Sequence, residues 1–464
     1  MKKRRYALLL TICMLTGIIG CGKPQSDEPV GTSGMQPGEP AGASGMQPGE
    51  PPGTSEPQSG TPNTTGSGNG GAGQAGAVQY DEEEMEMLRN GVNGFSYHLF
   101  ERLEGEENIF FSPYSLCSAL SLLNLGAGSE TEEELEALLG ITDIEAWNDA
   151  MRAYMETQWQ DETFVLTSNS IWMREGKEWS EGIETDFLKP AEEFYKSELY
   201  EADFLGNPQD TLARINNWAN DNTNGMIREV LREIPIDAAM ILMNAVYFEG
   251  KWETPFMEED TFEEVFVGTT GGNEIEMMHQ YGEYYAYIET EVSPGASIKG
   301  IALPYKDSPL VMKIFLHDGR GEIASLFGAL TTEEKEALLD SLDNAPREKI
   351  ARLAIPKFTM EQEIKGLSEI LQEMGMERAF RIGEADFDKI AEDLYVSQVL
   401  HKAKIEVDEQ GTKAAAVTTI VTNDAAAPIE EEPIVFVADH PFIYVIQDTR
   451  TGMILFMGQV NHLE

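Results

Sequence analysis

The side chains that most often perform catalysis are present in this chain of 464 residues, but their spacing forms no recognisable active site. The six histidines lie far apart, and none has the paired spacing of a zinc-binding motif. The chain has no Gly-x-Ser-x-Gly nucleophile turn and no glycine-rich turn before a helix that could hold phosphate. Its 81 acidic residues are too numerous to single out a catalytic pair. The residues therefore give no positive evidence for an enzyme, and they imply no metal or cofactor.

Four polar residues need partners because each of them interrupts an apolar stretch of sequence. They are Ser112, Ser115, Asn244 and His401. A buried polar group costs free energy unless it forms a hydrogen bond. One hypothesis is that these are four unrelated core groups, each satisfied locally. The other is a single internal cluster that links one helix to two strands.

The elements that would position these residues follow from the patterns around them. The Ser-Pro pair at 112–113 offers a helix N-cap and a proline at the first helical position, and the helix that follows is apolar enough to be buried. Residues 241–248 form an apolar run broken by Asn244, which predicts a strand. In residues 401–408 an inner face that starts with His401 alternates with charged residues, which predicts a half-buried strand. Helices predominate early and strands late, so we expect an α+β fold.

The segment 409–433 joins two strand-like runs near the C-terminus. A compact domain rarely contains so long a connection. Within it, residues 414–422 carry no charge, and the stretch 417–422 consists of β-branched side chains that favour strands. The sequence predicts a strand here that has no evident place in a sheet.

The N-terminal part is predicted to lie outside the globular region, which begins at residue 80. Residues 1–21 combine basic residues with a short apolar run, the layout of an export signal. Their end resembles the lipobox of bacterial lipoproteins, so Cys21 would carry acyl chains. Ordinary secretion and an uncleaved anchor are the alternatives. Residues 22–79, rich in Gly, Pro and Ser, would form a disordered, flexible tether.

The chain is strongly acidic, with a formal net charge of −48. Loss of the four basic residues of the signal would take this charge to −52. Such a charge effectively excludes nucleic acid as a partner and favours solubility. Of the three cysteines, only Cys117 lies in the globular part, so no internal disulfide is expected. We expect a monomer.

Several segments resemble the serpins, a family of serine protease inhibitors, and the resemblance runs from about residue 81 to residue 464. The matching segments are 108–115, 126–135, 215–227, 244–252 and 396–416. The last of them is the most specific. Each segment alone is a moderate signal, and together they are a strong one.

The resemblance implies one domain with about nine helices and three mainly antiparallel β-sheets, in which the segment 409–433 is an exposed reactive-centre loop. It implies that the four polar residues named above form a hydrogen-bonded shutter beneath the central sheet. Lys357 and Glu409 would pair near Trp252 at the breach, the place where the loop enters that sheet.

The resemblance also implies a hinge at the start of the loop, made of Gly411, Thr412, Lys413, Ala414, Ala415 and Ala416. Insertion into a sheet requires small uncharged side chains on one face of the strand, and Thr412, Ala414 and Ala416 supply them. Lys413 replaces the glutamate that is usual in the family, but it falls on the alternate, outward face.

The bond that a protease would cut can be located from either end of the loop. Counting from Gly411 at the family's spacing gives Ala425 and Ala426, whereas counting back from the strand after the loop gives 427–430. We prefer the first because the inserted strand must reach a fixed distance. No Lys or Arg lies between positions 414 and 449, and no aromatic residue comes before Phe436. This composition suits elastase-like or subtilisin-like proteases.

The sequence therefore predicts a suicide inhibitor of a serine protease, exported and lipid-anchored, with its globular domain at the outer face of a bacterial membrane. The alternative is a non-inhibitory serpin that acts as a binding or scaffold lipoprotein. A hydrolytic enzyme or substrate-binding lipoprotein with a coincidental motif has the least support.

Overall fold

The structure is a computed structural model in which residues 81–103, 105, 107–156, 163–317, 322–412 and 432–464 are described. All of them belong to one unit, Gly73–Glu464. The signal with Cys21, the tether, the hinge residues 413–416 and the expected cut between Ala425 and Ala426 lie outside the described residues. Within the described part, no helix is long and apolar enough to cross a membrane.

The described ranges combine nine α-helices with large β-sheets, which confirms the predicted α+β class. The helices are α1 (Glu82–Leu103), α2 (Pro113–Gly126), α3 (Ser129–Leu139), α4 (Ile144–Met155), α5 (Lys189–Tyr195), α6 (Pro208–Asn222), α7 (Ile323–Gly328), α8 (Thr332–Asp343) and α9 (Leu367–Glu373).

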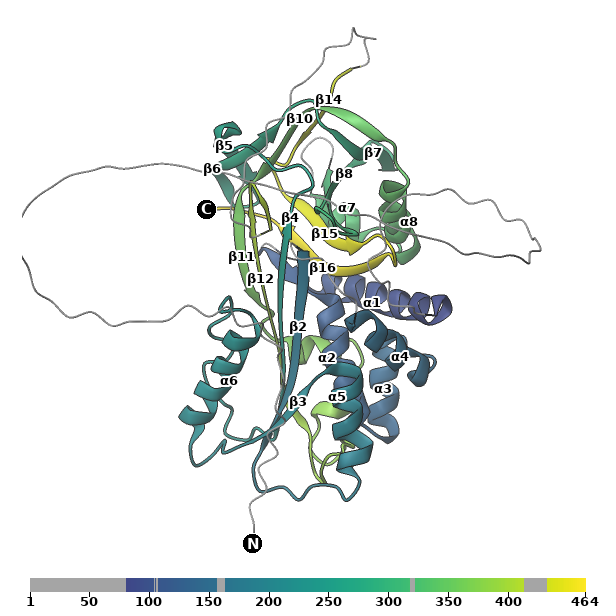
Figure 1. Ribbon diagram of the computed structural model, residues 1–464, viewed down its shortest axis with the longest axis vertical. Helices are drawn as coiled ribbons and strands as arrows, with labels where there is room; N and C mark the ends of the chain where they lie inside the picture. Colours follow the sequence, from purple (N-terminus) through teal and green to yellow (C-terminus); the bar gives the residue numbers. More distant parts are fainter. Residues whose placement is uncertain (1–80, 104, 106, 157–162, 318–321, 413–431) are drawn as a thin grey trace, which may run out of the picture. The chain divides into compact units, whose positions relative to one another are not determined.

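A six-stranded sheet runs through the centre of the domain (Figure 1). Its strand order is β11 (Phe358–Glu363), β12 (Val396–Asp408), β13 (Gly411–Thr412), β4 (Met240–Lys251), β2 (Thr163–Arg174) and β3 (Glu198–Ala202). Below the short β13, strands β12 and β4 pair directly with each other, in parallel. The pairs β2–β4 and β11–β12 are antiparallel.

The remaining strands form a ten-stranded sheet. Its order is β1 (Ile109–Phe111), β16 (Met453–Val460), β15 (Phe442–Asp448), β9 (Leu310–His317), β8 (Ala296–Pro304), β7 (Tyr284–Ser293), β10 (Arg347–Pro356), β6 (Gly271–Gln280) and β5 (Thr261–Gly268), with β14 (Ile434–Val437) beside β10. Strand β10 pairs with β7 through its first residues and with β6 through its last. Two of the three expected sheets are therefore continuous with each other through β10.

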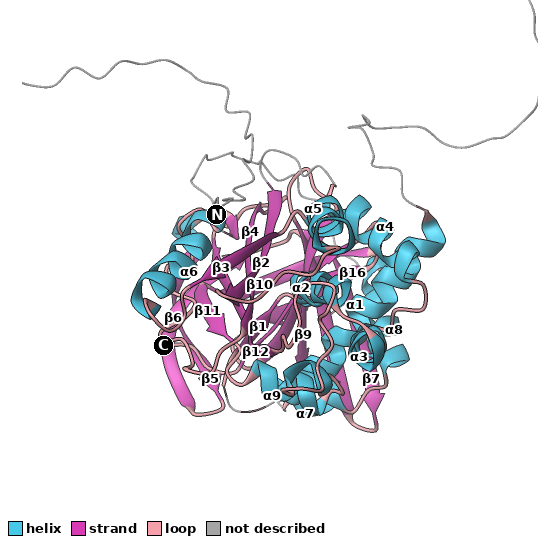
Figure 2. Ribbon diagram, turned by 90° about the horizontal axis from the view of Figure 1, so that it is seen from below, coloured by secondary structure: helices cyan, strands magenta, loops and turns pink. Residues whose placement is uncertain are grey.

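Strand β4 is apolar from Met240 to Phe248, apart from Asn244, because helices cover both faces of this part. Ile241, Met243 and Ala245 pack in one cluster with residues of α6, whereas Leu242 and Val246 belong to the main core with α2. Figure 2, seen from below, shows α6 on one side of these strands and α2 on the other. Alternation along the strand places the side chain of Asn244 on the same face as Leu242, toward α2.

Helix α2 begins where the sequence predicts. The Ser112 side chain accepts the backbone N–H of Ser115, and Pro113 occupies the first turn, where it removes no helical hydrogen bond. Every residue of this helix except Leu125 is buried. Cys117 is among them, and burial raises the pKa of its thiol well above the usual value. We therefore regard this thiol as part of the core.

Candidate functional site

The structure brings the four predicted polar residues into one cluster between α2, β4 and β12. The backbone N–H of Ser112 donates to Nε2 of His401 over 3.1 Å. The other ring nitrogen of His401 lies 2.5 Å from Oδ1 of Asn244. The Asn244 amide donates to the hydroxyl of Ser115 over 2.6 Å and to its carbonyl over 3.0 Å. The geometry matches the hypothesis of one internal cluster rather than four local groups.

Two further residues, Asn169 and Ser118, extend this cluster, and no sequence pattern indicates either of them. Asn169 on β2 accepts from the Asn244 amide over 2.6 Å and donates to Ser118 on α2 over 2.8 Å. Asn169 stands among threonine and serine residues, so nothing in its local sequence marked it as a buried group. The network therefore spans three neighbouring strands and the helix beneath them.

The protonation state of His401 follows from its contacts. Nε2 accepts a backbone N–H, so in the neutral ring the proton is on Nδ1 and is donated to Asn244. Burial lowers the pKa of His401 to about 3. The ring is therefore neutral at physiological pH, and the cluster carries no charge that would need compensation.

The His401–Asn244 contact joins the two strands that an inserting segment would have to separate. These residues are register partners in the parallel pairing of β12 with β4, which extends from Val396 and Met240 to Lys404 and Tyr247. Because the two strands are bonded directly over this length, the lower part of the sheet is closed.

The top of the same sheet contains the start of the loop. Thr412 pairs with Gly250 of β4 on one side and with Val407 of β12 on the other, antiparallel to both. Thr412 is fully buried. The Asp408 carboxylate stabilises the turn that leads there, since it accepts the backbone N–H groups of Gln410 and Gly411 over 2.9 and 3.2 Å.

Gly411 is expected to tolerate no side chain. Its φ of +153° is unfavourable for other residues, and a Cβ atom there would lie 2.2 Å from the carbonyl oxygen of Gly250. We expect Gly411→Ala to lower the free energy of unfolding by about 2 to 4 kcal/mol, measured by urea denaturation. Gly295→Ala is the matched control, because Gly295 also has positive φ but has open space around it. Equal losses in the two variants would contradict this account.

An ion pair lies beside the point where the loop enters the sheet. Lys357 Nζ is 3.1 Å from a carboxylate oxygen of Glu409. Partial burial alone would raise the pKa of Glu409, but a backbone hydrogen bond and the Lys357 ammonium hold it below its usual value. Trp252 is adjacent, and its ring N–H donates to the carbonyl of Asp408 over 3.0 Å. The three residues predicted for the breach are thus brought together.

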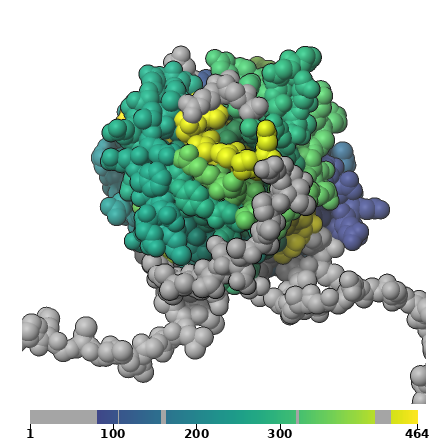
Figure 3. Space-filling model, turned by 90° about the horizontal axis from the view of Figure 1, so that it is seen from above, coloured from purple at the N-terminus to yellow at the C-terminus, as the bar shows by residue number. Residues whose placement is uncertain are grey.

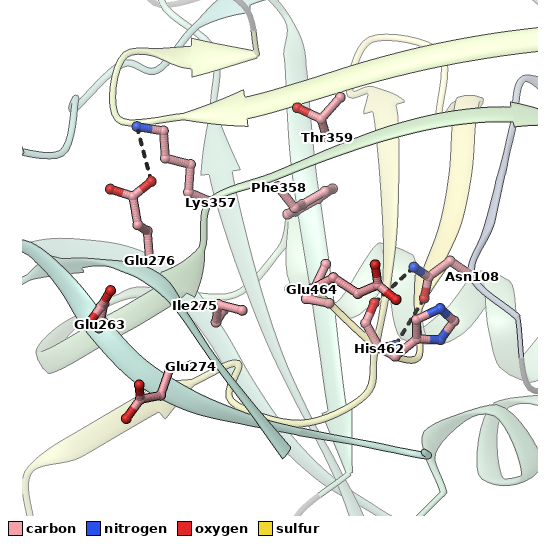
Figure 4. Close-up of a pocket in the computed structure, with 11 residues that line it drawn as sticks. Asn108, Glu263, Glu274, Ile275, Glu276, Lys357, Phe358, Thr359, His462 and Glu464 are labelled. Carbon is pink, nitrogen blue, oxygen red and sulfur yellow. Dashed lines mark hydrogen bonds and ion pairs between the residues drawn. The ribbon is translucent and has the colours of Figure 1, made fainter. Parts of the chain in front are cut away.

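Lys357 also borders a cavity of about 580 Å³ (Figure 4). Ile275 and Phe358 contribute apolar surface, and Lys357 contributes the one lysine among the lining residues. Glutamates supply most of the charge of this lining: Glu263, Glu274, Glu276 and Glu464. In the residues that the structure describes, no group of three or more His, Cys, Asp or Glu side chains could hold a metal ion.

Tyr305 also contacts the hinge, through Thr412, and no sequence pattern indicates this contact. Its hydroxyl shares a hydrogen bond of 2.8 Å with the hydroxyl of Thr412, and its ring stacks on Trp252 with centroids 4.8 Å apart. In the sequence, Tyr305 follows a proline at the end of an apolar run, a pattern that says nothing about a partner 107 residues away.

After the loop the chain continues into β14, which pairs in parallel with β10. Figure 3 shows this end of the molecule from above, where yellow C-terminal residues lie among teal and green ones. The described residues before and after the loop's central part therefore belong to different sheets. Thr412 pairs within the six-stranded sheet, and Ile434 pairs within the ten-stranded one.

Comparison with known proteins agrees with this architecture. A family model described as Serpin (serine protease inhibitor) matches residues 90–463. An uncharacterised serpin-like protein of Thermococcus kodakarensis is 34% identical over 391 residues, which cover 82% of this chain and 88% of that protein. Iripin-2 of Ixodes ricinus is 31% identical over 389 residues, covering 82% and 95% of the two chains. The crystal structure of tengpin, a thermophilic serpin in the native state, has a TM-score of 0.73 at 32% identity, covering 83% and 95%.

A central sheet that has accepted the first residues of a long loop, together with these similarities, defines the class of protein. The chain belongs to the serpin family. Membership supports a protease-inhibitor kind of function rather than catalysis, with proteases as the class of partner, although some serpins do not inhibit.

Proposed function

We propose that the chain is a suicide inhibitor of serine endopeptidases, which traps its target by inserting the loop 409–433 between β4 and β12. The observation that carries this proposal is the position of β13. Its two residues pair with both strands at the top of the sheet, directly above the point where the strands close on each other. An inserting strand would continue β13 downward in the same direction.

The chemistry of the first step belongs to the protease. Its serine oxygen would attack the carbonyl carbon at the cut while its histidine takes the serine proton. The peptide bond would then break, and the histidine would pass that proton to the nitrogen of the new amino terminus. The loop then remains attached to the protease as an acyl ester. If the freed strand inserts before water hydrolyses this ester, the protease is carried along and its active site is distorted.

Insertion would have a sufficient driving force. It replaces one ladder of hydrogen bonds, between β4 and β12, by two ladders, one on each side of the new strand. The net gain is about one hydrogen bond per inserted residue. At ~1 kcal/mol each, roughly a dozen residues would contribute on the order of 10 kcal/mol. This gain is comparable with the whole stability of a typical domain.

We further propose a target with a binding pocket for small side chains, of the elastase or subtilisin type. The proposed cut between Ala425 and Ala426, or within 427–430 by the alternative count, offers mostly small side chains. Trypsin-like and chymotrypsin-like enzymes find neither a basic nor an aromatic residue in this part of the loop.

Incubation of the mature chain with elastase is expected to give a complex that survives SDS gel electrophoresis. Trypsin should give none, because positions 414–449 contain no Lys or Arg. Elastase with its catalytic serine blocked is the control for non-covalent association. A clipped loop without a complex would contradict inhibition of this enzyme.

Heating separates the two kinds of serpin in the same experiment. A chain that inserts its cleaved loop should become markedly more resistant to heat than the uncut chain. A non-inhibitory member would show the same cut without that gain, and this result would favour the alternative function of binding or scaffolding.

We also propose that the chain is exported and held by lipid on Cys21 at the outer face of a bacterial membrane. The support is the signal-like sequence of residues 1–21 and the polar segment 22–79 that would separate the domain from the membrane. Mass spectrometry of the mature N-terminus tests it, since an unmodified residue 21 would exclude the lipid anchor.

A further inference from the structure

The first two hinge residues, Gly411 and Thr412, lie inside the sheet in the uncut chain. Thr412 has a strand on each side, and its side chain is fully buried. The described backbone pairing of β13 covers these two residues only, and a ladder of two residues contributes little stability by itself. A side-chain contact at Thr412 would add to this stability.

Tyr305 supplies that contact from a rigid place. Its ring stacks on Trp252 and meets Phe248 edge-on, with centroids 4.8 and 4.9 Å away. Gly250 makes room for it, because a Cβ atom there would lie 2.8 Å from the Tyr305 ring. The Tyr305 hydroxyl is thus held in place by three residues of the β4 strand and its continuation, and it bonds to Thr412.

We propose that Tyr305 is a positioning residue for loop insertion. Its hydrogen bond with Thr412 holds the first two hinge residues in place between β4 and β12, and their position sets the register in which the rest of the loop inserts. The inference rests on the proposed inhibitory function, because it concerns the rate and accuracy of the same insertion.

Register matters here because of Lys413. A strand that continues from Thr412 in this register would place Ala414 and Ala416 on the buried face and Lys413 on the opposite face. A slip by one residue would exchange the two faces and bring the lysine into the core. In this chain the hydrogen bond that fixes Thr412 therefore disfavours a one-residue slip, which would be costly because it would bury the charge of Lys413.

Tyr305→Phe is expected to raise the stoichiometry of inhibition about fivefold, the effect of losing one buried hydrogen bond at the step where insertion competes with hydrolysis. Thr412→Val should have the same effect, Thr412→Ser should behave like the unchanged chain, and the double variant Tyr305→Phe/Thr412→Val should be no worse than either single one. In a Lys413→Ala background the effect of Tyr305→Phe should shrink, since a slipped register is then tolerated.

Tyr195→Phe is the matched control, because it removes another buried tyrosine hydroxyl, which bonds to Asn148 on α4 and not to the hinge. It should lower the melting temperature to a similar extent without changing the stoichiometry. If both variants change the stoichiometry alike, or if Tyr305→Phe lowers it, Tyr305 does not position the loop. Additive losses in the double variant would also overturn the proposal.

A measurement on the uncut chain separates this inference from the proposed function. Amide hydrogen exchange of the peptide 405–412 should be faster in Tyr305→Phe than in the unchanged chain or in Tyr195→Phe. An unchanged exchange rate in Tyr305→Phe would show that Tyr305 does not hold Thr412 in place, even if the chain inhibits proteases. If exchange is faster in Tyr305→Phe but the unchanged chain traps no protease, Tyr305 positions Thr412 and the proposed inhibitory function is wrong.

Discussion

Thr412→Arg is expected to convert the chain from an inhibitor into a substrate of its protease. Thr412 is fully buried between β4 and β12, so an arginine there would place an unpaired charge inside the sheet. Burial of an unpaired charge costs several kcal/mol, which would expel the hinge and delay insertion until the acyl ester has been hydrolysed. We expect the stoichiometry of inhibition to rise by more than about tenfold, since ~1.4 kcal/mol already corresponds to a factor of ten.

The readout is the ratio of SDS-resistant complex to cleaved chain at a fixed ratio of inhibitor to protease. Thr270→Arg is the matched control, because it introduces the same charge at an exposed turn between β5 and β6. The control should form as much complex as the unchanged chain. A Thr412→Arg variant that still forms complex at the original stoichiometry would refute insertion through this hinge.

Asn244→Ala is expected to produce the largest loss of stability among the buried polar residues. The substitution leaves the Ser115 hydroxyl, the side-chain oxygen Oδ1 of Asn169 and the His401 ring without the Asn244 partner that each now has. Each unsatisfied buried group costs about 1 to 3 kcal/mol. We therefore expect the free energy of unfolding to fall by at least about 3 kcal/mol, measured by urea denaturation of the uncut chain.

The same substitution should also loosen the contact between β4 and β12, because Asn244 and His401 bridge them at one register position. On moderate heating, the variant should therefore lose inhibitory capacity faster than the unchanged chain, as the sheet opens without a cut. Asn222→Ala, which removes a single hydrogen bond to Trp218 at the end of α6, is the control. Similar losses in both variants would show that the position of Asn244 between the strands has no special effect.

Local sequence patterns predicted the elements of the site well. The Ser-Pro pair at 112–113 marked the start of α2, and the apolar run around Asn244 marked β4. These predictions succeed because capping, periodicity and burial depend on neighbours within a few positions. The ion pair of Lys357 with Glu409 was expected only from resemblance to the serpins, since 52 residues separate the two in the chain.

Three features were beyond the reach of local patterns. Asn169 gave no signal because its neighbours are polar, and Tyr305 gave none because its partner is distant in sequence. The continuity of two expected sheets through β10 depends on which strands meet its two halves. Each of these is a matter of packing between segments that the chain brings together only when it folds.

The residue types of this chain by themselves determined its α+β class, its long loop with an uncharged stretch at 414–422, and the need for partners of four buried polar groups. Only the tertiary structure decided that these groups share one neutral network and that the network bridges the strands β4 and β12. It also decided that Thr412 lies between β4 and β12 in the uncut chain and shares a hydrogen bond with Tyr305. The physical reason is that burial can be recognised from the pattern of a single segment, whereas a hydrogen-bond partner depends on how separate segments pack.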